Sequence, residues 1–143
     1  MEFFAKRFNE LTVTQLYEIL KSRAEIFLLE QNISCQDLDN RDYDSLHCFF
    51  NDDKRVVAYL RAFYSEKDVV TIGRVLTLSH GNGIGRDLMN NSIEKIKTSL
   101  PCKKITVHAQ KQAVGFYEKM GCVIVSDEFV DEGVIHVTME YDL

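Results

Sequence analysis

The sequence predicts an α/β fold (α+β by some conventions) in which helices flank a mixed, mostly antiparallel central sheet. Three strand-like segments between residues 46 and 78 are separated by only a few polar residues, and connections that short join antiparallel strands. The last segment runs into a glycine-rich turn, an amphipathic helix and a fourth strand. A strand, a helix and a strand in that order form a crossover, which makes the two strands parallel.

The N-terminal part predicts a strand followed by a helix. The opening strand is expected at Phe3–Phe8. Thr12 and Gln15 have the spacing of a capping box, which marks a helix start. Apolar residues then recur at helical spacing and fade near Glu30, and a polar, acidic loop is expected at Asn32–Ser45.

The central strands are expected at Leu46–Phe50, Val56–Tyr64 and Val69–Leu78. Polar residues suited to tight turns separate them at Asn51-Asp52-Asp53 and Ser65-Glu66-Lys67. These three strands should therefore form an antiparallel meander.

The C-terminal half begins with a helix that Gly81–Gly85 opens and that ends before Pro101, since the residue preceding a proline disfavours helix. The elements expected after it are a strand, a short helix, a strand, a turn and a last strand: Ile105–Ala109, Ala113–Met120, Val123–Phe129, Asp131-Glu132-Gly133 and Ile135–Tyr141.

The length and composition fit one globular domain spanning residues 1–143. Seventeen Lys and Arg residues against 22 Asp and Glu residues give a formal net charge of −5. This charge argues against a nucleic-acid partner, because phosphate binding needs a basic face. An acidic surface also favours cationic small molecules, although it serves solubility equally well.

The four cysteines show no C-x-x-C spacing and have no histidine where a zinc module would place one. The first residues, Met-Glu-Phe-Phe-Ala-Lys-Arg, carry charge too early for the apolar core of a signal peptide. No apolar run approaches the length of a membrane span. We therefore expect reduced thiols, no metal, no membrane partner and a cytoplasmic location.

The glycine-rich turn predicts an anion site, because it runs directly into a helix. The first amides of a helix lack internal acceptors and lie at the positive end of its dipole. Gly81, Gly83 and Gly85 let the backbone approach a ligand. The dinucleotide fingerprint is excluded because Arg86 stands where its third glycine belongs, and no P-loop is present. Taken alone, the pattern also fits a plain helix-start turn.

A second segment, from Gln110 to Cys122, follows the next strand. Together the two segments resemble the signature of the GNAT superfamily. There, [Q/R]-x-x-G-x-[G/A] holds the CoA diphosphate, and a downstream N-x-x-A-x-x-F-Y-E-K-x-G-F helix closes the cofactor site. The first motif corresponds to His80 through Gly85. The matches to the second are Gln110, Ala113, Phe116, Tyr117, Glu118, Lys119 and Gly121.

The resemblance covers almost the whole chain and is strongest to the ElaA-like branch, which implies the GNAT fold. The residues that carry this part are Arg23, Phe27, Glu30-Gln31, Gln36-Asp37-x-Asp39, Ile72-Gly73-Arg74-Val75, Gly133-x-x-His136 and Met139.

The resemblance implies acetyl-CoA as co-substrate. The diphosphate would bind the amides of Gly81–Gly85, and the pantetheine arm would pair with Val75–Thr77 like an added strand. An amide of Leu76 or its neighbour would polarise the thioester carbonyl. The residues expected to bind the cofactor are Val75, Leu76, Thr77, His80, Gly81, Asn82, Gly83, Ile84, Gly85, Arg86, Gln110, Phe116 and Tyr117.

Tyr117 matches the family tyrosine that protonates the departing thiolate, with simple packing of Phe116 and Tyr117 as the alternative. Three residues or segments depart from the pattern. His80 replaces the usual Arg or Gln, the connection from Val75 to His80 is shorter than in the branch, and Cys122 stands where Phe is common. The first two would weaken cofactor binding.

The implied reaction is direct attack by an unidentified primary amine, from a small molecule or a peptide. The amine must be neutral, so a base or a water relay must remove a proton. The candidate bases are Glu30, His47, His108 and His136. Glu30 and His136 lead, because they lie beside the acidic loop and in the branch motif. Asp37, Asp39 and Asp42 either attract a cationic acceptor or form a solvated loop.

Other function classes remain open. The chain could be a non-catalytic acyl-CoA-binding module or a plain interaction domain. A covalent thiol intermediate at Cys102 or Cys122 is disfavoured, because nothing in the sequence signals a base beside either thiol. The oligomeric state is expected to be a monomer or a homodimer.

Overall fold

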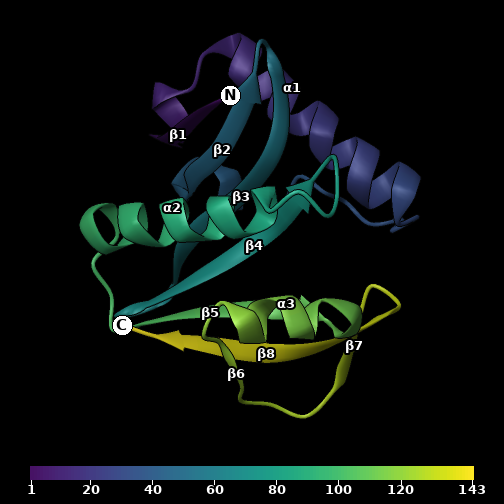
Figure 1. The fold of residues 1–143 in the computed structure, drawn as a ribbon, viewed down its shortest axis with the longest axis vertical. Coiled ribbons are helices and arrows are strands. Elements are labelled where there is room, and N and C mark those ends of the chain that lie inside the picture. The colour runs from purple at the N-terminus through teal and green to yellow at the C-terminus, as the bar shows by residue number, and fades with distance from the viewer.

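The computed structural model, which describes residues 1–143, contains one eight-stranded sheet with helices on both faces (Figure 1). The strand order is β1-β2-β3-β4-β5-β8-β6, and β7 also pairs with β8. The strands are β1 (Glu2–Arg7), β2 (Leu46–Asp52), β3 (Arg55–Glu66), β4 (Val69–Thr77), β5 (Lys104–Gln110), β6 (Val123–Ile124), β7 (Phe129–Asp131) and β8 (Val134–Asp142). The helices are η1 (Phe8–Glu10), α1 (Val13–Arg23), η2 (Ala24–Glu30), η3 (Arg41–Asp44), α2 (Ile84–Ser99), η4 (Lys111–Ala113) and α3 (Val114–Lys119).

The first four strands form the expected antiparallel meander. The tight turns fall later than predicted, at residues 53–54 and 67–68. Asp53 and Asp68 adopt positive φ values of 58° and 63°, a conformation that aspartate tolerates better than most residues. The strands therefore extend further than their apolar residues alone indicated.

Two helices cover opposite faces of this meander. Ile19 of α1 packs on one face in a buried cluster that includes Tyr59 and Leu76. On the other face α2 contributes Leu88 and Ile96 to a larger cluster that continues to β5, β8 and α3. The capping box of α1 is present as predicted, and α2 ends at Ser99, just before Pro101.

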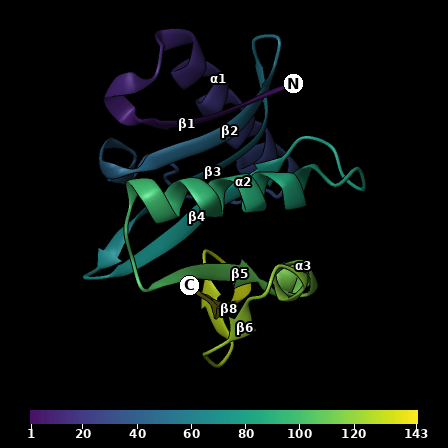
Figure 2. The same ribbon diagram turned by 60° about the vertical axis from the view of Figure 1, so that its left-hand side comes forward.

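The parallel pairing of β4 and β5 is short and opens into a wedge. Pairing runs from Val69 opposite Lys104 to Ile72 opposite Val107 and stops there. Beyond it the two strands diverge, as both views show (Figures 1 and 2). The edge of β4 that faces β5 is consequently unpaired from residue 73 onward.

A β-bulge in β4 lies where this pairing ends. Tyr59 of β3 pairs with Leu76 and Arg61 pairs with Gly73, so one residue of β3 faces two residues of β4. Arg74, the first of those two, has φ of 53°, which is rare for a residue other than glycine. Such a bulge bends its strand and re-aims its backbone groups.

The helical segment reaches Glu30 as predicted, and its last part, η2, is a π-helix, as the hydrogen bond from the Gln31 amide to the Ile26 carbonyl shows. One sequence prediction needs correction. The single strand predicted at Val123–Phe129 is wrong, because β6 and β7 are separate. The Ser126 hydroxyl accepts the Thr138 amide at 2.8 Å, so a side chain interrupts the ladder there.

All four cysteines are free, with Cys48 and Cys122 buried. None of the helices is both long and apolar enough to span a bilayer.

Candidate active site

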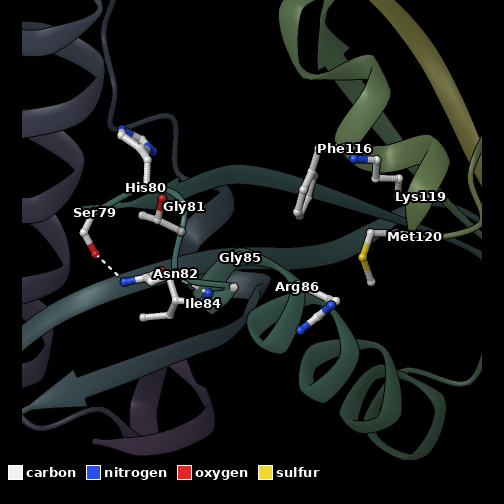
Figure 3. A pocket seen from close by; sticks show the side chains of 12 residues that line it. Ser79, His80, Gly81, Asn82, Ile84, Gly85, Arg86, Phe116, Lys119 and Met120 are labelled. Atoms are coloured by element: carbon white, nitrogen blue, oxygen red, sulfur yellow. Dashed lines mark hydrogen bonds between the residues drawn. The ribbon is translucent and has the colours of Figure 1, made fainter.

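The loop before α2 forms a cradle of backbone amides. Gly81 and Gly83 have φ values of 78° and 77°, which explains why glycine stands at both positions. Oδ1 of Asn82 accepts a hydrogen bond from the Ile84 amide at 3.2 Å, and Nδ2 of Asn82 donates one to the Ser79 hydroxyl at 2.9 Å (Figure 3). The next two amides, of Gly85 and Arg86, have no acceptor within the chain.

A pocket of ≈ 580 Å³, here called the loop pocket, lies against this cradle. Its lining residues are Thr77, Ser79, His80, Gly81, Asn82, Gly83, Ile84, Gly85, Arg86, Phe116, Lys119 and Met120. Arg86 and Lys119 bring positive charge from opposite sides, one from α2 and one from α3 (Figure 3). Free amides, a helix N-terminus and two cationic side chains are all features that favour a negatively charged group.

A second pocket of ≈ 540 Å³, here called the wedge pocket, lies where β4 and β5 diverge. Val75 and Tyr117 line it, while their neighbours Thr77 and Phe116 line the loop pocket. The two pockets therefore neighbour each other along β4 and α3. The unpaired edge of β4 runs between them.

Tyr117 is buried, with 6% of its surface exposed, and lines the wedge pocket. Burial raises the pKa of its hydroxyl, and no hydrogen bond within the chain lowers it. The ring also packs edge-on against Phe116, with centroids 5.1 Å apart. Tyr117 thus packs against its neighbour on α3, and its protonated hydroxyl belongs to a side chain that lines the wedge pocket.

His136 and His108 line the wedge pocket from β8 and β5. Nδ1 of His136 lies 2.8 Å from the Val134 carbonyl oxygen, which can only accept a proton. Nδ1 therefore donates, and Nε2 of the neutral ring keeps its lone pair. Nδ1 of His108 lies 3.2 Å from the Thr138 hydroxyl, which can donate or accept, so that contact does not fix the tautomer.

The other two candidate bases lie elsewhere. Glu30 is exposed at the end of η2, 3.6 Å from Nε2 of His80, and lines neither pocket. His47 is buried between the Tyr59 hydroxyl at 2.7 Å and the Asp42 carbonyl at 2.9 Å. Burial lowers the pKa of His47, which is a structural residue rather than part of the wedge pocket.

The acidic loop is the part of the site that differs most from the sequence interpretation. Asp37, Asp39 and Asp42 are neither a freely solvated cluster nor free to attract a cation, because arginines bind all three. The ion pairs are Arg23–Asp37, Arg23–Asp42, Arg61–Asp39, Arg61–Asp42, Arg74–Asp37 and a longer one, Arg74–Asp39 at 3.6 Å. The arginines come from α1, β3 and β4, so no local pattern in the sequence predicted that they would contact the loop.

Of the residues predicted to bind the cofactor, the loop pocket gathers Thr77, the loop from His80 to Arg86, and Phe116. The wedge pocket gathers Val75, Gln110 and Tyr117. The Leu76 side chain lines neither, because it is 3% exposed and packs toward α1.

Several residues that line the two pockets were not predicted as site residues from the sequence, and three of them carry charge that bears on the ligands: Lys119, Asp131 and Glu132. Lys119 lies inside the second motif, whose spacing alone could have indicated it. Asp131 and Glu132 lie in a segment that the sequence predicted only as a turn. In the structure they line the wedge pocket from the β7–β8 hairpin.

Burial raises the pKa values of the Cys122 and Cys102 thiols, which opposes formation of a nucleophilic thiolate at either position. No group of three or more His, Cys, Asp or Glu side chains has an arrangement that could hold a metal ion.

Comparison with known proteins agrees with this geometry. The family described as acetyltransferase (GNAT) domain matches residues 17–143. The chain is 33% identical to Protein ElaA of Escherichia coli (strain K12) in an alignment of 137 residues that covers 92% of this chain and 90% of that protein. It is also 33% identical to UPF0039 protein C11D3.02c of Schizosaccharomyces pombe, over 100% of this chain and 98% of that one.

Solved structures give the same result. The crystal structure of Escherichia coli ElaA superposes with a TM-score of 0.92 at 30% identity, covering 99% of this chain and 100% of that one. An acyl-CoA N-acyltransferase from Pseudomonas aeruginosa superposes with a TM-score of 0.91 at 27% identity, covering 99% of each chain. The chain therefore belongs to the GNAT acetyltransferase family, in its ElaA-like branch.

Proposed function

We propose that the chain, acting as one domain over residues 1–143, transfers an acetyl group from acetyl-CoA to a primary amine by direct attack. One observation carries the proposal: the unpaired edge of β4 runs from the amide cradle at α2 to Tyr117. Acetyl-CoA is an extended ligand with a diphosphate near one end and a thioester at the other. The loop pocket offers an anion site for the diphosphate, and the wedge pocket offers the buried Tyr117 hydroxyl for the thioester.

The loop pocket would take the diphosphate. The free amides of Gly85 and Arg86 and the side chains of Arg86 and Lys119 would contact its oxygens. The pantetheine arm would add to the free edge of β4 beside Val75, as an extended peptide adds to a sheet edge. An amide on that edge would polarise the thioester carbonyl.

The chemistry then needs one base and one acid. We assign the base to Nε2 of His136, because its lone pair is free and the ring lines the wedge pocket, whereas Glu30 does not. The amine nitrogen attacks the thioester carbon and its proton passes to His136. The C–S bond breaks, and the Tyr117 hydroxyl protonates the departing thiolate.

The acceptor would enter past the β7–β8 hairpin. Asp131 and Glu132 line the wedge pocket and form no ion pair within the chain, unlike Asp37 and Asp39. Uncompensated carboxylates attract cationic amines, whether small molecules or peptides. The free cysteines fit a reducing compartment, and we propose the cytoplasm.

A thermal-shift titration with acetyl-CoA, with ATP and NAD as controls, tests the cofactor. A ligand at 100 times Kd stabilises the folded state by about 2.7 kcal/mol. We expect a rise in Tm with acetyl-CoA that ATP and NAD do not reproduce, followed by CoA release in an amine screen. Binding without turnover across that screen would favour the non-catalytic module. No shift at millimolar acetyl-CoA would contradict the proposal.

A further inference from the structure

Asp37 joins the end of α1 to the bulge of β4. One carboxylate oxygen accepts Nε of Arg23 at 2.9 Å, and the other accepts Nε of Arg74 at 2.8 Å. The Asp37 carbonyl oxygen accepts Nη2 of the same two arginines, at 3.2 Å and 3.0 Å. Asp37 therefore makes four charge-assisted hydrogen bonds that fix two elements relative to each other. We call Asp37, Arg23 and Arg74 the Asp37 clamp.

The clamp acts on the backbone that the proposed reaction uses. Arg74 is the bulge residue with φ of 53°, and both Arg74 and Val75 beside it line the wedge pocket. A residue other than glycine stays in this conformation only when its surroundings hold it there. The two bonds from the Arg74 side chain to Asp37 supply such a restraint.

The other two arginines that bind the acidic loop, Arg23 and Arg61, stabilise the fold. The Arg23 side chain is 0% exposed and also pairs with Asp42, and the buried Arg61 pairs with Asp39 and Asp42. These pairs neutralise buried charges, so removing them would destabilise the fold. Arg74 is different because its side chain is 26% exposed, and its two partners stay paired without it, Asp37 with Arg23 and Asp39 with Arg61. Arg74 can therefore be changed without leaving a buried charge unpaired.

We propose that Arg74, held by Asp37, is a positioning residue for acetyl transfer. It fixes the bulge so that the free edge of β4 next to Val75 presents its amide to the thioester. This inference rests on the proposed function. Its new element is that the contact between the Arg74 side chain and Asp37, in the loop at residues 32–45, sets the geometry of the β4 edge that polarises the thioester.

The test compares Arg74→Ala, Arg74→Lys and a control, Arg55→Ala. Arg55 also forms a part-exposed ion pair, with Glu25, but lines neither pocket. We expect Arg74→Ala to lower kcat about 10- to 100-fold, since misplacement by about 1 Å can cost that much. The Kd for acetyl-CoA should change less than about threefold, because the diphosphate contacts of the loop pocket remain. Arg74→Lys should recover part of kcat, and Arg55→Ala should leave kcat unchanged.

Amide hydrogen exchange of residues 73–77 provides a readout that does not need turnover. Exchange in this segment should rise in Arg74→Ala and stay as in the wild type in Arg55→Ala. Unchanged exchange, or an unchanged kcat with a lowered Tm, would overturn the positioning role. A wild-type protein that lacks turnover would instead contradict the proposed function. In that case the exchange result still decides whether Arg74 holds the bulge.

Discussion

The ring of Phe116 lies directly over Gly85, so that a Cβ at this glycine would stand 3.4 Å from the ring carbon Cε1. The contact joins α3 to the first turn of α2 and closes one side of the loop pocket (Figure 3). The two motifs of the sequence, about thirty residues apart, are thus two halves of one site. A Cβ at residue 85 would thus touch Phe116 at ordinary contact distance, which leaves no room for a larger side chain.

Gly85→Val should weaken acetyl-CoA binding about tenfold, because its branched side chain must displace Phe116 and distort the pocket. Gly85→Ala should have a small effect, since its Cβ makes an ordinary contact. Gly115→Ala is the matched control, as nothing lies within 4 Å of its Cβ position. Calorimetric Kd values check this prediction. Equal affinity in all variants would mean that the contact between Gly85 and Phe116 does not affect cofactor binding.

Gly83→Glu should abolish acetyl-CoA binding. The new carboxylate would stand at the anion site, and a side chain is strained at φ of 77°. Gly83→Asn controls for strain, because asparagine tolerates this conformation and carries no charge. The thermal-shift assay should show no response for Glu and a partial response for Asn. A normal response in the Glu variant would remove the loop from the binding site.

Tyr117→Phe should slow turnover by about 10²- to 10⁴-fold if the hydroxyl is the general acid. Its Tm and its Kd for acetyl-CoA should stay close to those of the wild type, because the hydroxyl forms no hydrogen bond within the chain and the ring remains. Tyr64→Phe, whose hydroxyl bonds the Pro101 carbonyl on another part of the surface, is the control. Undiminished kcat in Tyr117→Phe would leave Tyr117 as a packing residue.

Acid should destabilise the protein partly through Asp39. Hydrogen bonds from Arg61 hold the pKa of this carboxyl well below its ordinary value of about 3.9. A carboxyl whose pKa is lower in the folded state adds stability that is complete above the unfolded pKa and is lost as the pH falls below it. Tm should therefore drop steeply below about pH 4 in the wild type.

Asp39→Asn removes that contribution. It should cost about 3 kcal/mol at pH 7, because the buried Arg61 loses its main partner, and it should flatten the acid limb of the Tm–pH curve. Asp44→Asn, an exposed neighbour without an ion pair, should leave the curve unchanged. Parallel curves for Asp39→Asn and the wild type would mean that Asp39 contributes no pH dependence.

Local chemistry in the sequence predicted most of the secondary structure. The capping box at Thr12, the glycines before α2 and the proline after it act within a few residues, so they can be read directly from the chain. The strand predicted at Val123–Phe129 failed because the Ser126 hydroxyl takes a ladder bond from Thr138, a long-range contact that apolar spacing does not show.

The sequence by itself determined the family, the order of the elements and the amide cradle, because these depend on spacing and on the conformational freedom of glycine. Only the tertiary structure decided which ionisable groups are available. Sheet pairing brings Arg61 and Arg74 to the acidic loop, where they form ion pairs with Asp39 and Asp37. It also puts His136 at the wedge pocket and Glu30 outside it. Burial and ion pairing depend on residues distant in the chain, and no local pattern records them.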